Sequence, residues 1–382
     1  MNLKETCPIT LSGEHEPFAI VLCGGGAAGR WQAGVLVGLA QAGVVEKASV
    51  IAGTSVGGLN AGLFTVFGGN LPKPEEMSDD IGDNVLPPPP GYDRDIGNLV
   101  ASTTDIAPPP PWRTAVDVWE DIKKNEDVYK GSMDLFGKIG AAIGLLFNSA
   151  DAALDASPLR KRLDNIFGQL SLQDVPEYFN THLIISSLDL NTHREEFYCS
   201  FDESNSIKVA EALKRTSAIP GVFASVPGQD SWEKEIHWHV DGGLGANNPF
   251  IGLNKYNQMF PGASVKKAII VYCYPDEEVD MGTGIVTPVS TKRFKTMREV
   301  LLESIPASLN VQEYMTELTV EDKVASGGWD VLALYPKKAP CDALDFTKLE
   351  LLQQGYDYVV DGKGYSYRDK AEINIVDFLR RK

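Results

Sequence analysis

Two stretches near the start of the chain share one order: an apolar strand pattern, a turn containing glycine, and a helical pattern. Phe18–Cys23 and Ser49–Ala52 are short, mainly apolar runs that predict buried strands. After each run, apolar residues recur at three- and four-residue spacing, within Trp31–Ala40 and Leu59–Phe67, and this spacing predicts helices. The stretch Phe18–Phe67 therefore predicts two strand–turn–helix units side by side.

The alternation of strand and helix patterns resumes further along the chain. Strands are predicted at His182–Leu190, Arg194–Cys199, His237–Val240, Lys267–Tyr274 and Trp329–Tyr335. Helices are predicted at Thr114–Lys124, Ser157–Phe167, Val209–Lys214, Thr291–Ile305, Leu351–Val360 and Ala371–Arg381. Ser157 is expected to be an N-cap with Pro158 in the first turn, and Asn247–Pro249 to cap the helix that follows it. Strands that alternate with helices predict the α/β class, with a layered and mostly parallel sheet.

Two segments interrupt this pattern. Residues 69–112 contain the tetraproline runs Pro87–Pro90 and Pro108–Pro111, which favour extended chain and are excluded from a sheet interior. We predict a surface insertion there, with a proline motif for a protein partner as the alternative. Met133–Phe147 is apolar all round and predicts a packed helix, the alternative being a lid or membrane-touching helix over an active site.

Composition narrows the class of protein. The 382 residues are 43% hydrophobic and 23% charged, as in an ordinary globular protein, and suffice for one large α/β domain or two smaller ones. The net charge of −17 argues against a nucleic-acid partner and against tight docking on anionic membranes. Five cysteines without close pairs predict free thiols in a reducing compartment and no zinc site. The polar N-terminus and the lack of a long apolar run predict a cytoplasmic protein without a signal peptide or transmembrane segment.

The second glycine turn carries a serine. Gly53-Thr54-Ser55-Val56-Gly57 runs from a predicted strand into a predicted helix, which is the pattern of a nucleophile elbow. Gly53 and Gly57 leave room for a tight turn that lifts Ser55 above the strand ends, and the helix start places backbone N–H groups beside it. The alternative is a turn of small residues that serves packing only.

The first glycine turn, Gly24–Gly29, has three interpretations. It matches a dinucleotide fingerprint, but that site expects an acidic residue after the next strand, and Glu46 lies before it. A phosphate-binding P-loop is excluded because Arg30 and Trp31 stand where lysine and serine or threonine are needed. The third interpretation is an oxyanion hole, since consecutive glycines expose backbone N–H groups.

The residue that would activate Ser55 is open at this point. The histidines are His15, His182, His193, His237 and His239. His237 and His239 share one face of a predicted strand and look structural. Asp241 ends that strand before Gly242 and Gly243, and a carboxylate bonded to a serine can accept its proton if the site is dry.

Five motifs, in order, resemble the patatin-like phospholipase family. They are Gly24–Gly29, Gly53–Gly57, Ser217–Phe223, Asp241–Gly243 and Asn247–Pro249. The resemblance implies a three-layer α/β/α fold around a central, mostly parallel sheet. It also implies a catalytic Ser55–Asp241 dyad and an oxyanion hole at Gly24, Gly25 and Gly26. Gly29, Gly53, Gly57, Gly242 and Gly243 complete the family's motifs.

One position departs from the family pattern. The family usually has lysine or arginine before the last glycine of the first turn, where this chain has Ala28, and Arg30 follows the glycine instead. Either Arg30 supplies that charge or the charge is absent. The resemblance covers roughly residues 17 to 275. It implies a single catalytic domain over 1–382, with an insertion of a proline-rich loop and helices at 69–155 and an α/β extension at 276–382.

The function that this resemblance implies is hydrolysis of acyl esters of membrane lipids, with no metal or organic cofactor. The expected partner is a membrane phospholipid or another acyl lipid, met by peripheral contact. A thioesterase or a neutral-lipid esterase with the same dyad is the first alternative. A lipid-binding module without catalysis follows, and a nucleotide-binding enzyme comes last because the acid for the ribose is missing.

Overall fold

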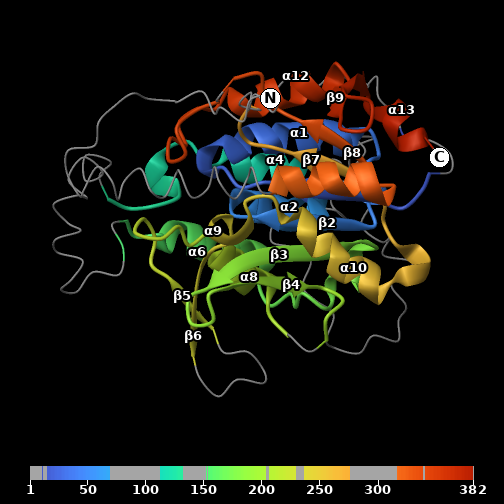
Figure 1. Ribbon diagram of the computed structural model, residues 1–382. Helices are drawn as coiled ribbons and strands as arrows, with labels where there is room; N and C mark the ends of the chain where they lie inside the picture. The colour runs from blue at the N-terminus through green and yellow to red at the C-terminus, as the bar shows by residue number, and fades with distance from the viewer. Residues whose placement is uncertain are drawn as a thin grey trace, which may run out of the picture.

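A single mixed sheet forms the centre of the molecule (Figure 1). The computed structural model describes residues 11, 15–68, 112–131, 152, 154–203, 206–228, 236–275, 316–338 and 340–381. Within these ranges the sheet has ten strands: nine follow the order β10-β9-β8-β7-β1-β2-β3-β6-β5, and the tenth, β4, pairs with β3. The strands are β1 Phe18–Leu22, β2 Val50–Thr54, β3 His182–Asp189, β4 Arg194–Cys199, β5 Val226–Gly228, β6 His237–Asp241, β7 Lys267–Val271, β8 Asp330–Leu334, β9 Lys363–Ser366 and β10 Ala371–Asn374.

The middle of the sheet is parallel and its edges are antiparallel. Strands β8, β7, β1, β2 and β3 run in one direction. At one edge β9 and β10 are antiparallel, and at the other β4, β6 and β5 are. The predicted mostly parallel sheet is therefore confirmed for its central strands. The carboxyl ends of β1, β2 and β3 meet at one side of the sheet.

Side chains of the central strands alternate between two apolar cores, as the two-residue period of a strand requires. In β1, Phe18, Ile20 and Leu22 face one core, while Ala19 and Val21 face the other. Both faces are thus covered, and the predicted three-layer α/β/α arrangement is confirmed.

The two outer layers differ in size. The core of the larger layer takes residues from α1 Gly29–Gln41, α2 Val56–Phe67, α4 Trp112–Glu120, α6 Ser157–Phe167, α7 Val175–Phe179, α8 Val209–Thr216, α12 Leu351–Val360 and α13 Ile375–Arg380. The core on the opposite face takes residues from α10 Leu253–Met259 and from a helix over residues 316–327. Short turns of helix complete the chain: η1 Gly26–Ala28, η2 Val45–Lys47, η3 Asn125–Asp127, α9 Gly243–Ala246, η4 Pro249–Gly252 and η5 Pro261–Ala263.

Helix α12 lies directly against α1, which links the C-terminal part of the chain to the first strand–turn–helix unit (Figure 1). Two glycines permit the close crossing. A Cβ on Gly34 would lie 2.0 Å from the carbonyl oxygen of Leu352, and one on Gly355 would lie 1.9 Å from that of Trp31. The C-terminal segment is therefore packed against the helix that follows the first glycine turn.

Two predictions about helices need correction. The expected helix Ala371–Arg381 is wrong in its first half, because Ala371–Asn374 is β10, paired with β9, and Asn374 then caps the short helix α13. Ser157 is the first residue of α6 rather than its N-cap, and Ala156 takes the cap position. The carboxylate of Asp155 instead accepts hydrogen bonds from the N–H and hydroxyl of Ser157.

Other predictions agree with the structure or fall outside it. The remaining predicted strands and helices in the described ranges appear within a few residues of their expected bounds. Asn248 accepts a hydrogen bond from the N–H of Phe250 and caps η4, as predicted. The proline runs, the segment Met133–Phe147 and the helix Thr291–Ile305 lie outside the described residues. In the described part of the chain, no helix has both the length and the apolar character needed to span a bilayer.

Candidate active site

Ser55 is the single residue between the end of β2 and the start of α2, and its backbone conformation is one that favours glycine. Its φ is 55° and its ψ is −129°. For a residue with a side chain, such a conformation costs on the order of 1–3 kcal/mol. Two neighbours make the turn possible: a Cβ on Gly53 would lie 2.3 Å from the carbonyl oxygen of Gly57, and one on Gly57 would lie 2.2 Å from that of Leu22. The predicted strand–turn–helix context of Ser55 is therefore present, with its glycines where the backbones touch.

Asp241 ends β6 beside this turn. Ser187 of β3 is its partner in the antiparallel register. The hydroxyl of Ser55 donates to Oδ2 of Asp241 at 2.6 Å, and the N–H of Gly243 donates to Oδ1 at 2.8 Å. A Cβ on Gly242 would lie 2.6 Å from the carbonyl oxygen of Ser186, so only glycine fits after the aspartate. Burial raises the pKa of Asp241 to about 7, and the bonds from Ser55 and Gly243 oppose this rise. A carboxylate with such a pKa can exchange a proton with a serine near neutral pH.

The first glycine turn lies against the same serine. A Cβ on Gly24 would lie 3.1 Å from that of Ser55 and 2.4 Å from Oδ1 of Asn247. The N–H of Gly24 donates to the carbonyl oxygen of Asn247 at 3.1 Å. The N–H groups of Gly25 and Gly26 make no hydrogen bond to the part of the chain that the structure describes. Gly24 therefore supplies the close approach to Ser55 and holds the turn, and the next two residues keep N–H donors that no described residue binds.

An apolar pocket opens beside Ser55 and Gly26. Its cavity volume is about 60 Å³. Its walls come from α2, α4, α6, the loop after α8 and the C-terminal segment. Representative lining residues are Leu59, Leu63, Ile122, Leu163, Phe223 and Phe346. The site thus combines a hydroxyl–carboxylate pair with an apolar chamber.

The family model of the patatin-like phospholipases matches residues 20–253. This chain belongs to that family. The matched region contains the first glycine turn, Ser55 and Asp241, and membership supports an activity as a lipid hydrolase. Among solved structures, VipD from Legionella pneumophila is similar, at 13% identity and a TM-score of 0.35, over 97% of this chain and 71% of that one. No curated protein matches the sequence.

Arg30 is the residue that could supply the charge that the family usually has at the position of Ala28. Its side chain is buried and donates to the carbonyl oxygens of Ile122 and Phe346, the latter at 3.4 Å. The guanidinium also lies 5.7 Å from the centre of the Trp119 ring. Burial lowers the pKa of Arg30. Arg30 therefore ties two walls of the pocket to α1 and takes no part in lining it.

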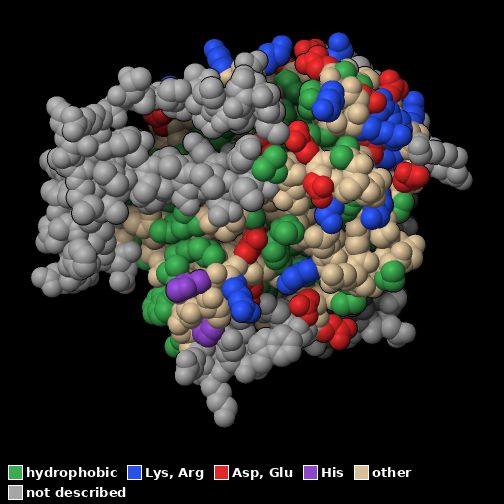
Figure 2. Space-filling view, in the orientation of Figure 1, with side chains coloured by type: hydrophobic (Ala, Val, Ile, Leu, Met, Phe, Trp, Pro, Cys, Tyr) green, Lys and Arg blue, Asp and Glu red, His purple; other side chains and the backbone are tan. Residues whose placement is uncertain are grey.

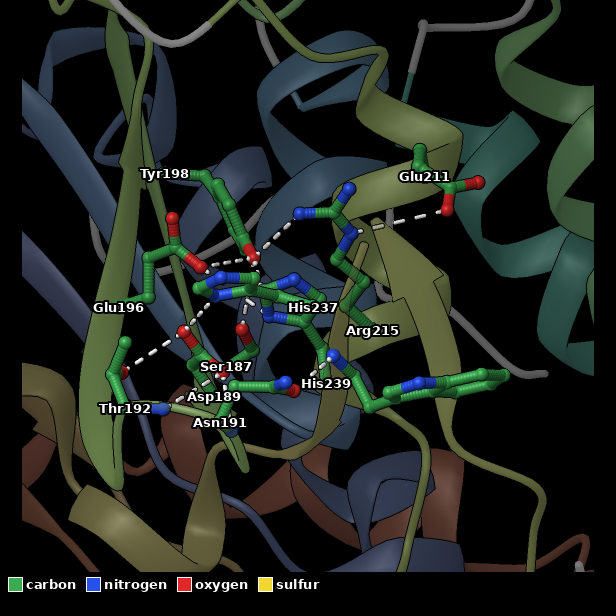
Figure 3. A network of polar contacts seen from close by, with 11 residues as sticks. Ser187, Asp189, Asn191, Thr192, Glu196, Tyr198, Glu211, Arg215, His237 and His239 are labelled. Carbon is green, nitrogen blue, oxygen red and sulfur yellow. Dashed lines mark hydrogen bonds and ion pairs between the residues drawn. The ribbon is translucent and has the colours of Figure 1, made fainter. Parts of the chain in front are cut away.

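None of the histidines is the hydrogen-bond partner of Ser55 Oγ in the described structure. His237 Nδ1 lies 2.7 Å from Oδ2 of Asp189, and His239 Nδ1 lies 3.2 Å from the hydroxyl of Tyr198 (Figure 3). His182 contacts Ser200 and a group of aromatic rings. These contacts agree with the interpretation of the strand histidines as structural residues. No group of three or more histidine, cysteine or acidic residues in the described ranges is placed to hold a metal ion.

Sequence reasoning missed several residues of this patatin-like site. Thr216 Oγ1 accepts the N–H of Ser55 at 2.8 Å, and Ala343 O accepts the N–H of Ala27 at 2.7 Å. Thr216 lies at the border of the recognised motif Ser217–Phe223, which was the available signal. Nothing in the sequence around Ala343 marks it, because its role comes from tertiary packing on Gly26, whose Cβ would lie 2.1 Å from the Ala343 carbonyl oxygen.

Proposed function

We propose that this protein is a lipid acyl hydrolase that cleaves carboxylic ester bonds of phospholipids or related lipids through a Ser55–Asp241 dyad. The observation that carries the proposal is the 2.6 Å hydrogen bond from Ser55 Oγ to a buried carboxylate whose pKa is raised to about 7. A nucleophile directly bonded to its base is the arrangement that acyl transfer needs. Membership of the patatin-like family supports the lipid substrate.

In the first step, Ser55 Oγ attacks the ester carbonyl carbon while Asp241 accepts the hydroxyl proton. The carbonyl becomes a tetrahedral oxyanion, and its collapse breaks the bond to the alcohol oxygen. Asp241 returns the proton to that oxygen, so the lysolipid or alcohol leaves neutral and the acyl group stays on Ser55. In the second step, Asp241 takes a proton from water, which attacks the acyl-serine. The fatty acid is released and the proton returns to Ser55.

The oxyanion of both steps is assigned to the first glycine turn. Gly25 and Gly26 supply N–H groups that make no hydrogen bond to the described residues, and the start of α2 adds its N–H groups. One such donor is typically worth about 3 kcal/mol of transition-state stabilisation. Gly24 contributes by its lack of a side chain beside Ser55.

The acyl chain is assigned to the apolar pocket. Leu59 and Leu63 lie one and two turns along α2 from Ser55, and both line the pocket. At 1.5 Å per residue, Leu63 lies about 12 Å along the helix from the serine. An extended hydrocarbon chain attached to Ser55 would follow this face of α2.

Contact with the membrane is assigned to the tip of β6. Strand β6 carries Asp241 and, three residues earlier, Trp238, whose exposed fraction is 44%; that of Ile236 is 57%. The carbonyl oxygen of Trp238 accepts the N–H of Leu190, which is also 44% exposed. Figure 2 shows hydrophobic side chains beside the histidines at this end of the molecule. Exposed tryptophan and aliphatic groups favour the membrane interface. We expect Trp238→Ser, made in a Ser55→Ala background, to weaken binding to phosphatidylcholine vesicles. Unchanged binding would contradict the assignment of membrane contact to the tip of β6.

The test of the chemistry is labelling with a fluorescent fluorophosphonate, followed by peptide mapping. We expect labelling at Ser55 in the wild type, none in Ser55→Ala, and at least a 100-fold slower reaction in Asp241→Asn. Turnover of phosphatidylcholine, triacylglycerol and acyl-CoA then separates a phospholipase from a neutral-lipid esterase and a thioesterase. Wild-type ester hydrolysis by Asp241→Asn would contradict the dyad.

A further inference from the structure

A buried polar cluster joins α8 to strands β3, β4 and β6 (Figure 3). Its centre is the hydroxyl of Tyr198, which accepts from Arg215 at 2.8 Å and from Ser187 at 3.1 Å, and donates to Glu196 at 2.7 Å. A phenol has one proton, and here Glu196 receives it. His239 Nδ1 lies 3.3 Å from the same carboxylate oxygen and 3.2 Å from the Tyr198 hydroxyl.

The cluster surrounds the strand end that presents Asp241. Ser187 is the register partner of Asp241 on β3. His239 precedes Asp241 by two residues on β6, so their side chains leave the strand on the same face. Tyr198 and Glu196 on β4 complete the set. A change in this cluster would therefore act on the position of β6 next to Asp241.

The residues that follow Arg215 hold the backbones of both dyad members. Thr216 Oγ1 accepts the N–H of Ser55 at 2.8 Å. The carbonyl oxygen of Ala218 accepts the N–H of Asp241 at 2.9 Å. The segment Thr216–Ala218 thus fixes the backbones of Ser55 and Asp241 relative to each other. Arg215 directly precedes this segment in the chain.

Two glycines, one on β5 and one on α2, leave space for the side chains of Arg215 and Thr216. A Cβ on Gly228 of β5 would lie 2.0 Å from a terminal nitrogen of Arg215, and a Cβ on Gly58 of α2 would lie 2.8 Å from Cγ2 of Thr216. Arg215 itself is 4% exposed. Burying a guanidinium costs free energy unless the group is hydrogen-bonded. The hydrogen bond to the Tyr198 hydroxyl therefore stabilises the Arg215 side chain in this position.

We propose that Arg215, held by the Tyr198 hydroxyl, is a positioning residue for the Ser55–Asp241 dyad. The inference rests on the proposed function. Arg215 is absent from the pocket lining, so it acts through Thr216 and Ala218 and not on the substrate. Because Ser55 has a disfavoured backbone conformation, a weaker hold on its N–H lets the turn relax away from Asp241. The effect should fall on kcat and on the reactivity of Ser55, with KM for a short ester nearly unchanged.

The test compares Tyr198→Phe, Arg215→Lys and Arg215→Ala with the wild type. The readouts are the rate of fluorophosphonate labelling at Ser55, and kcat and KM for p-nitrophenyl butyrate. We expect about a 10-fold fall in kcat and in labelling for Tyr198→Phe, and a larger fall for Arg215→Ala, with KM within about twofold. Millimolar guanidinium should restore part of the activity of Arg215→Ala and none of that lost in Tyr198→Phe.

Tyr356→Phe is the matched control, because it removes the hydroxyl of another buried tyrosine, bonded to Gln41 at 2.7 Å between α12 and α1. It should lower thermal stability without changing kcat. Tyr198→Phe that behaves like this control, losing stability but keeping its labelling rate, overturns the inference. If Arg215→Ala does not fold, Tyr198→Phe decides alone. A wild type that does not label at Ser55 would instead refute the proposed function, and the positioning role with it.

Discussion

Ser55 Oγ and Asp241 Oδ2 lie 2.6 Å apart although 186 positions separate these residues in the sequence. They come from the end of the parallel strand β2 and the end of β6, which runs antiparallel to its neighbour β3. Strand β6 pairs only with Ser187–Asp189 at the end of β3, so its last residue, Asp241, lies level with the end of β2, where Thr54 pairs with Ser186. The mixed edge of the sheet is therefore part of the site's construction.

The first prediction concerns the pH dependence of the rate. Burial raises the pKa of Asp241 to about 7, and the proposed base must be deprotonated to accept the serine proton. We expect kcat/KM for p-nitrophenyl butyrate to rise about tenfold per pH unit below pH 7 and to level off above it. The rate of Ser55 labelling should follow the same curve. A flat profile between pH 5 and pH 9 would show that Asp241 is not the base.

The same shift predicts that Asp241→Asn is inactive but more stable. The folded state binds the proton of Asp241 more tightly than the unfolded chain, so the free energy of unfolding falls as pH rises from about 4 to about 7. The shift of about 3 units corresponds to a loss of up to about 4 kcal/mol at pH 8. Asparagine removes this cost: its oxygen accepts from the N–H of Gly243, and its NH2 group donates to Ser55 Oγ. Thermal unfolding should give a higher Tm for the variant at pH 8 and a smaller difference at pH 4. A lower Tm at pH 8 contradicts the expectation.

The sequence predicted the site better than its surroundings. Periodicity placed the strand before Ser55 and the helix after it, and the motifs named Ser55 and Asp241, because strand–turn–helix units have local signals. Arg30 could not be placed from sequence, since the carbonyl groups that it binds belong to residues 122 and 346. The strand at Ala371–Asn374 was missed for a related reason: four residues with a helix-compatible pattern become a strand only by pairing with β9.

Arg30 gives a prediction about stability. Arg30→Met removes a buried guanidinium and leaves the carbonyl groups of Ile122 and Phe346 without it, so we expect the free energy of unfolding to fall by about 2–5 kcal/mol. Arg113→Met is the matched control. Its ion pairs with Asp117 and Glu120 are partly exposed, and its loss should cost less than about 1 kcal/mol. Denaturant titration measures both, and equal effects would show that Arg30 does not tie the pocket walls together.

The pocket gives a prediction about chain length. Leu63 is 5% exposed and lines the pocket about 12 Å along α2 from Ser55, so a larger side chain there should block only the distal part of an acyl chain. We expect Leu63→Trp to lower kcat/KM for p-nitrophenyl palmitate by about 10–100-fold and to change that for the butyrate by less than threefold. Leu63→Met, which nearly conserves volume, should leave both substrates unaffected. Equal losses for both chain lengths in Leu63→Trp would mean that the acyl chain does not run along α2, because a block at Leu63 spares a chain too short to reach it.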